Sequence, residues 1–127
     1  MSATTTQITQ IGTVIIPVSD QDRALEFYVG KLGFQTRVDG PYGEGLRWIE
    51  VAPPGAATTI ALVAPRRGDP SGFEVSFATR DAEADHAALL ARGVDADAAV
   101  MRMGGFVPPM FTFRDPDGNR FRVVERD

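Results

Sequence analysis

The chain has 127 residues, of which 43% are hydrophobic and 24% are charged, a composition typical of one globular domain that is long enough to bury a real core. Its formal net charge of −4 and its scattered basic residues argue against a nucleic-acid partner, because nucleic-acid binders concentrate Lys and Arg on one face. It contains no cysteine, which excludes disulfides, thiolate metal sites and cysteine nucleophiles.

The N-terminal segment, residues 1–10, is rich in Thr and Gln and has neither a basic start nor an apolar run. No secretion signal is therefore expected, and no stretch of the chain approaches the length of a membrane span. These features predict a cytoplasmic protein with no membrane partner, in which residues 1–10 form a flexible tail.

The first half of the domain, residues 11–64, predicts the element order βαβββ. Residues 11–18 are β-branched and apolar, which favours a buried strand. Asp20 is placed to cap a following helix, whose apolar residues recur at helical spacing until Gly33 ends the run. Three shorter strands are expected after turns that contain Gly and Pro, at residues 34–39, 46–51 and 58–64.

The same pattern starts again in residues 72–125, after a linker-like stretch at residues 65–71. A strand at residues 72–79 precedes an Ala- and Leu-rich helix at residues 81–92, and three short strands follow. The last hairpin turns at DPDGN, residues 115–119, where Pro, Gly and Asn supply the backbone angles of a tight turn.

The two halves are related by one sequence offset, although few side chains are identical. This offset relates three pairs of positions: Asp20 and Asp81, Thr13 and Glu74, and Ala61 and Arg122. Such a repeat predicts two equivalent half-units that share one core or cleft.

Two segments carry a family resemblance: VSDQDRALEFYVGKLGF at residues 18–34 and FRDPDGNRFRVVE at residues 113–125. They resemble the vicinal oxygen chelate superfamily, which includes glyoxalases, bleomycin-resistance proteins and extradiol dioxygenases. The resemblance extends over residues 11–125 and implies an α+β fold, in which paired βαβββ modules form a cupped mixed sheet. Because the superfamily uses one scaffold for isomerisation, ring cleavage, thiol transfer and drug binding, it indicates the fold more firmly than the function.

The resemblance also implies where a metal site would lie. In metal-using members, four ligands, usually His and Glu, come from the first and last strands of each module. The matching positions here are Thr13, Ala61, Glu74 and Arg122, with Thr59 and Val63 as alternatives to Ala61. Alanine donates no lone pair and arginine brings a fixed positive charge, so a lone Glu74 cannot hold a transition metal. The sequence therefore predicts no metal and no cofactor.

Glu74 and Arg122 are expected on neighbouring strands of one module, with both side chains directed into the cup and in contact. One hypothesis is a salt bridge that fills the vacated metal position, because unpaired buried charges are costly. The other is that Arg122 engages a carboxylate, phosphate or enolate oxygen of a ligand while Glu74 orients it or accepts a proton. Both residues are therefore candidate catalytic residues, and the two hypotheses are compatible.

Further candidates for ligand binding are aromatic or lie at the implied ligand positions. Trp48 and Glu50 alternate with apolar residues, so they either line the cup, with Trp48 as a platform for planar ligands, or serve for packing and solvation. Phe106 lies in MRMGGFVPP, residues 101–109, which is either a loop over a cleft or a plain connector. The sole histidine, His86, is expected to face water without a function. The predicted ligand-binding set is Thr13, Trp48, Glu50, Ala61, Glu74, Phe106 and Arg122.

The leading hypothesis for function is a metal-independent small-molecule-binding protein resembling the drug-sequestering, bleomycin-resistance-like branch. It would be a homodimer that holds an acidic or carbonyl-bearing organic ligand in a cup shared between two chains. The first alternative is a metal-independent lyase or isomerase, glyoxalase-like, with Glu74 as base and Arg122 as oxyanion stabiliser. The second is a partner-binding or regulatory protein with a vestigial, self-filled pocket. Hydrolase, kinase and dehydrogenase motifs are absent from the sequence.

Overall fold

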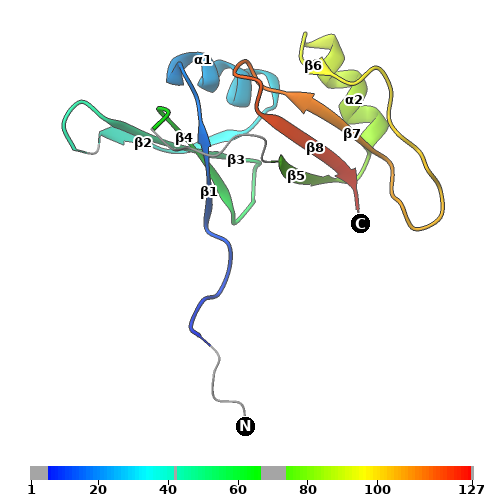
Figure 1. Ribbon diagram of the computed structural model, residues 1–127, viewed down its shortest axis with the longest axis horizontal. Helices are drawn as coiled ribbons and strands as arrows, with labels where there is room; N and C mark the ends of the chain where they lie inside the picture. The colour runs from blue at the N-terminus through cyan, green and yellow to red at the C-terminus, as the bar shows by residue number, and fades with distance from the viewer. Residues whose placement is uncertain (1–5, 42, 67–73, 127) are drawn as a thin grey trace.

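The computed structural model describes residues 6–41, 43–66 and 74–126, and within them two modules repeat one order of elements (Figure 1). The first module contains β1 (Thr13–Pro17), α1 (Gln21–Leu25), a π-helical segment η1 (Glu26–Lys31), β2 (Gln35–Pro41), β3 (Arg47–Ala52) and β4 (Thr59–Val63). The second contains β5 (Glu74–Thr79), α2 (Ala82–Ala91), β6 (Asp95–Ala96), β7 (Met110–Arg114) and β8 (Arg120–Glu125). The predicted α+β fold is confirmed. Of the predicted linker and tail, residues 67–71 and 1–5 lie outside the described residues, as do residues 72 and 73 of the second module.

The two modules have the same sheet topology. In the described residues, the strands form two four-stranded sheets with the orders β1-β4-β3-β2 and β5-β8-β7-β6. The first and last strands of each module pair in parallel, with Thr13 opposite Thr59 in the first sheet and Glu74 opposite Arg120 in the second. The offset visible in the sequence is therefore the register of a structural repeat.

Both helices begin where the sequence places a capping aspartate. The side chain of Asp20 accepts a hydrogen bond from the backbone N–H of Arg23 at 3.0 Å, and Asp81 accepts one from that of Ala84 at 3.0 Å. These bonds satisfy donors that have no partner within the first turn. The apolar spacing of the first helix predicted its buried residues Phe27 and Tyr28 but gave no indication of its π-helical second half.

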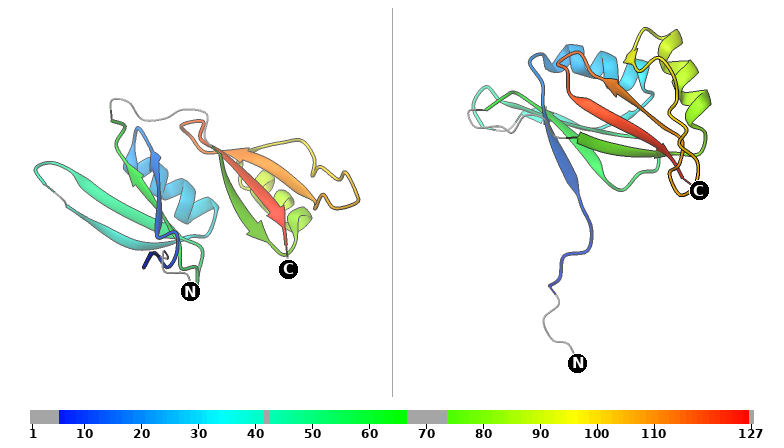
Figure 2. Two further views of the ribbon diagram at one scale, coloured as in Figure 1. Left: turned by 60° about the horizontal axis from the view of Figure 1, so that its bottom comes forward. Right: turned by 45° about the vertical axis from the view of Figure 1, so that its right-hand side comes forward.

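The helices lie on one side of the two sheets, and no helix of the described residues lies on the opposite side (Figures 1 and 2). Since side chains alternate along a strand, the residues between the core positions point to this uncovered side, which we call the open face of each sheet. The segment before β1 leads away from the body of the domain and carries exposed Ile8 and Ile11.

One hydrophobic core joins the two modules on the helix side. Its largest fully buried side chains are Tyr28, Phe111, Phe113 and Phe121. Rings of the first module meet rings of the second, with centroid distances of 5.9 Å between Tyr28 and Phe121 and 5.6 Å between Phe34 and Phe77. Phe27 and Tyr28 are thus core residues, as the helical spacing predicts.

The DPDGN turn fastens the second module to the first. The buried carboxylate of Asp115 accepts hydrogen bonds from the hydroxyl of Tyr28 at 2.8 Å and from the backbone N–H groups of Asp117 and Asn119 at 2.9 Å each. The side-chain amide of Asn119 donates to the same carboxylate at 2.8 Å and to the backbone carbonyl of Pro17 at 3.0 Å. The turn residues therefore have a tertiary role besides the local one.

The expectation that His86 faces water is wrong. Its side chain is buried, with a relative exposure of 8%, and its Nε2 atom lies 2.7 Å from the backbone carbonyl oxygen of Asp97. Its ring meets Phe111 edge to face at a centroid distance of 5.1 Å. His86 is therefore a core residue of α2 with a satisfied polar atom.

Among the described residues, neither helix has the length and apolar character that a membrane span requires.

Candidate functional site

A chain of hydrogen bonds runs across the open face of the first sheet. The indole N–H of Trp48 donates to Oε2 of Glu50 at 2.7 Å, and the hydroxyl of Thr59 donates to Oε1 of Glu50 at 2.7 Å. The hydroxyls of Thr13 and Thr59 lie 2.8 Å apart. Because Thr59 uses its proton on Glu50, Thr13 must be the donor in this last bond. The lone pairs of Thr13 remain available as acceptors for a ligand.

The network favours the ionised form of its central carboxylate. The hydrogen bonds from Trp48, and then from Thr59, lower the pKa of Glu50 below its ordinary value of 4.5, because donors aimed at a carboxylate favour its ionised form. Trp48 and Glu50 alternate with buried Ile49 and Val51 along β3, so both belong to the open face, and the bonds of Glu50 exclude the alternative of a freely solvated side chain. The open face thus presents the indole ring of Trp48 beside the carboxylate of Glu50, which already accepts hydrogen bonds from Trp48 and Thr59.

The open face of the second sheet carries the expected charge pair. Nη2 of Arg122 donates to Oε1 of Glu74 at 3.2 Å, and Nη2 of Arg120 lies 3.6 Å from the same oxygen. The predicted contact between Glu74 and Arg122 is thus confirmed. The expectation that the two charges are buried, so that leaving one unpaired would be costly, is wrong. The side chains of Arg122 and Glu74 retain exposures of 40% and 36%, so water screens the pair and a ligand can reach it.

A hollow of about 280 Å³ lies beside this pair. It is lined by Glu74, Val75, Ser76, Pro108, Met110, Arg122, Val124 and Arg126. Among the described residues, none forms an ion pair with Arg126. The hollow therefore combines two guanidinium groups and one carboxylate at its polar side with a thioether and aliphatic carbons at the other.

The single chain brings some of the predicted residues together and separates others. Thr13, Trp48 and Glu50 share the open face of the first sheet, whereas Glu74 and Arg122 share that of the second. Ala61 lies on the same face, opposite Ile15 and Glu50, but its side chain is fully buried. The residue opposite Thr13 in the register is Thr59, the alternative position. The side chain of Phe106 is fully exposed. Whether these residues bind a ligand remains a prediction.

The residues at the four implied ligand positions do not fit a metal ion. Arg122 places its guanidinium within hydrogen-bond distance of Glu74, where a cation would compete for the same oxygen. Ala61 offers no donor atom, and the hydroxyl of Thr13 already donates to Thr59. In the described parts of the chain, no group of three or more His, Cys, Asp or Glu residues is placed to hold a metal.

Sequence reasoning missed three polar residues of these surfaces. Thr59 was considered only as a register slip, yet it connects Thr13 to Glu50. Arg120 and Arg126 lie two and four residues from Arg122, and alternation along a strand would have placed Arg120 on the same face. Arg126 follows the end of β8, so no periodicity indicated where its side chain lies.

Comparison with known proteins supports this architecture. A family model described as the glyoxalase/bleomycin resistance protein/dioxygenase superfamily matches residues 10–123. The chain is 34% identical over 123 residues to YetH of Bacillus subtilis (strain 168), an uncharacterized protein, covering 93% of this chain and 99% of YetH.

Solved structures share both the fold and part of the sequence. The crystal structure of TnmS3, an antibiotic binding protein from Streptomyces sp. CB03234, has a TM-score of 0.84 and 34% identity, covering 97% of this chain and all (100%) of TnmS3. A superfamily member from Sphaerobacter thermophilus has a TM-score of 0.85 and 35% identity, covering 95% of this chain and 100% of its own.

Proposed function

Because the chain belongs to the glyoxalase/bleomycin resistance protein/dioxygenase superfamily, we propose that it is a metal-independent protein that binds and sequesters a small organic molecule. The ligand is a planar or partly apolar molecule that bears a carboxylate or another acidic oxygen. TnmS3, which shares 34% of its sequence over nearly the whole chain, is described as an antibiotic binding protein. A drug-like ligand is in keeping with that likeness.

One observation carries this proposal: the hollow beside Glu74 and Arg122 is open to solvent and has one charged side and one apolar side. Arg122 and Arg126 border it as donors for an anionic group, and only one carboxylate, Glu74, opposes them. Guanidinium groups form strong hydrogen bonds with planar carboxylates. Met110 and Val124 supply apolar contact area for the rest of the ligand. An open hollow also disfavours the alternative of a vestigial, self-filled pocket.

We propose further that two chains form a homodimer in which the open face of the first sheet covers this hollow of the partner. Ile15 and Val38 are exposed on the first module, and such apolar side chains favour burial against a second surface. The pairing would bring Trp48 and Thr13 opposite Arg122, which unites the predicted ligand-binding residues. Sedimentation at micromolar concentrations tests it, since a strictly monomeric mass excludes a shared site.

The ligand class is tested by calorimetric titration with 2-naphthoate and with its uncharged analogue 2-naphthamide. We expect naphthoate to bind more tightly, and Arg122→Ala to weaken it by about 1.5 kcal/mol, roughly tenfold, the lower end for a hydrogen bond to a charged group because the site is half-exposed. Glu74→Ala should strengthen naphthoate binding, since it removes the opposing charge. Arg102→Ala is the matched control, because Arg102 pairs with Glu83 outside the hollow.

Equal affinity for both probes, or an Arg122→Ala variant that binds naphthoate like the unmodified protein, would contradict the proposed site. A lyase or isomerase acting through Glu74 remains a prediction from the sequence. Incubation of a ligand recovered from the purified protein, followed by mass spectrometry, tests whether it is chemically changed. The cytoplasmic location also remains a prediction, which cell fractionation can check.

A further inference from the structure

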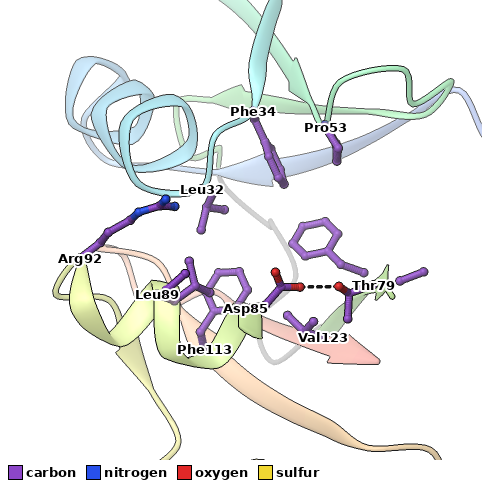
Figure 3. A pocket seen from close by; sticks show the side chains of 12 residues that line it. Leu32, Phe34, Pro53, Thr79, Asp85, Leu89, Arg92, Phe113 and Val123 are labelled. Atoms are coloured by element: carbon purple, nitrogen blue, oxygen red, sulfur yellow. Dashed lines mark hydrogen bonds between the residues drawn. The ribbon is translucent and has the colours of Figure 1, made fainter. Parts of the chain in front are cut away.

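A second cavity, of about 200 Å³, lies on the helix side of the second sheet, where the two modules meet (Figure 3). Residues of α2, β5 and the core face of β7 and β8 form most of its lining, and Leu32, Phe34 and Pro53 of the first module close it. Apart from Ala78, the strand residues of the lining point to the helix side, and the cavity shares no lining residue with the hollow beside Glu74 and Arg122. The cavity is therefore separate from the site proposed above.

The walls of this cavity are mainly aromatic and aliphatic. Phe34 and Phe77 meet edge to face across the module boundary, and the ring of Phe77 stacks near Phe113 at a centroid distance of 6.2 Å. Leu89 of α2 adds an aliphatic side chain to the lining (Figure 3). Such walls favour an aromatic ring, which gains from edge and face contacts as well as from burial.

One end of the cavity is anionic. Asp85 projects from α2 into the cavity beside Thr79 (Figure 3), whose hydroxyl donates a hydrogen bond to Oδ2 of Asp85. Among the residues that the structure describes, none places a cationic group within ion-pair distance of Asp85. The second carboxylate oxygen, Oδ1, is therefore available to a ligand, and a positively charged group would offset its partial desolvation.

The other charged residue of the lining is already engaged at the opposite end. Arg92 donates from Nη1 to the backbone carbonyl oxygen of Lys31 at 2.8 Å. Asp85 lies in the first half of α2 and Arg92 is its C-cap residue, which separates their backbones by about 10 Å along the helix axis. The two charged side chains therefore lie at opposite ends of the cavity (Figure 3).

We propose that this cavity binds a small arylalkyl ammonium ion. Its ring rests against Phe77, Phe113 and Leu89, and its ammonium group donates hydrogen bonds to Asp85. The size is suitable, because an apolar cavity of roughly 150 Å³ holds a benzene ring, which leaves room in this one for a short alkyl arm. Since both modules line the cavity, an occupant stabilises their contact.

The probe is 2-phenylethylammonium, added at millimolar concentrations to the ¹⁵N-labelled full-length protein and followed by amide chemical shifts. We expect saturable shifts centred on Phe77, Asp85 and Leu89. The anion 3-phenylpropionate, of similar size and opposite charge, should bind at least tenfold more weakly. Asp85→Asn should weaken binding of the ammonium ion at least tenfold.

Two further variants separate binding from folding. Ala88→Leu places a larger side chain in the cavity from the same face of α2 and should abolish binding while retaining a folded amide spectrum. Glu83→Gln, on the same helix but paired with Arg102, should leave binding unchanged. The proposal is overturned by an absence of saturable shifts, by binding that survives Ala88→Leu, or by equal affinity for the two probes.

Discussion

Removing the hydroxyl of Tyr28 should loosen the contact between the two modules. The hydroxyl donates to Oδ2 of Asp115 at 2.8 Å, and this bond joins the first helix to the last hairpin. Tyr28 is fully buried and Asp115 is 5% exposed, so water cannot replace the lost donor. In Tyr28→Phe the ring contacts with Phe27 and Phe121 are kept, and only the hydrogen bond is lost.

The expected loss in the free energy of unfolding is about 2 kcal/mol, within the range for a hydrogen bond to a charged group. It is not larger, because the carboxylate of Asp115 keeps two backbone N–H donors and the side-chain amide of Asn119. Urea titration followed by Trp48 fluorescence measures the loss. The control is Ser19→Ala, which removes an exposed hydrogen bond to Asp117 and should cost less than about 1 kcal/mol.

A double-mutant cycle with Asp115→Asn isolates the interaction. Because the two side chains are in contact, the cycle should give a coupling energy of about 1–2 kcal/mol. A Tyr28→Phe variant no less stable than Ser19→Ala, or a cycle whose two effects simply add, would refute the reasoning that this bond fastens the modules.

Four other predictions concern the cap of α2, two titrating groups and the metal. Asp81→Ala should lower the free energy of unfolding by about 1 kcal/mol, because it removes the N-cap of α2, and urea titration can measure this loss. Burial, followed by the charge of Asp115, raises the pKa of Tyr28 above its ordinary value of 10.0. The contribution of Tyr28 to the free energy of unfolding should therefore be fully present below pH 10 and be lost as pH rises above that value. Tyr28→Phe should remove this loss in urea titrations at alkaline pH. For Glu50 the pKa is lowered, so its contribution is present above pH 4.5 and is lost as pH falls through the folded-state pKa; Glu50→Gln should flatten that acid limb. Elemental analysis should find no stoichiometric transition metal, and one metal per chain lost on Glu74→Ala would overturn the ligand assignment.

Local rules predicted the elements well because their causes are local. Asp20 and Asp81 cap the helices as the sequence indicates, since the donors that they satisfy lie three residues away. The alternation in β3 also indicated that Trp48 and Glu50 share one face. The alternation could not predict the hydrogen-bond network on that face, because Thr59, which bonds to Glu50, comes from another strand.

Local rules could not predict contacts between side chains that come from distant segments of the sequence. His86 was expected to face water, but β7 covers its side of α2 and the carbonyl of Asp97 satisfies its ring. The DPDGN motif was read as a turn, yet Asp115 bonds to Tyr28 across the module boundary. The cavity beside Asp85 was not anticipated either, because its lining comes from both modules.

The sequence by itself determined the α+β class, the repeat of two βαβββ modules and the pairing of Glu74 with Arg122. The repeat follows from periodicity, capping and one constant offset, which act over short stretches or repeat in register. The fold class and the pairing were implied by the family resemblance of residues 18–34 and 113–125. Only the tertiary structure decided how exposed that pair is, which residues border its hollow and what lies between the modules. Exposure and cavity shape depend on how elements distant in sequence pack together, and no local pattern of residues encodes that packing directly.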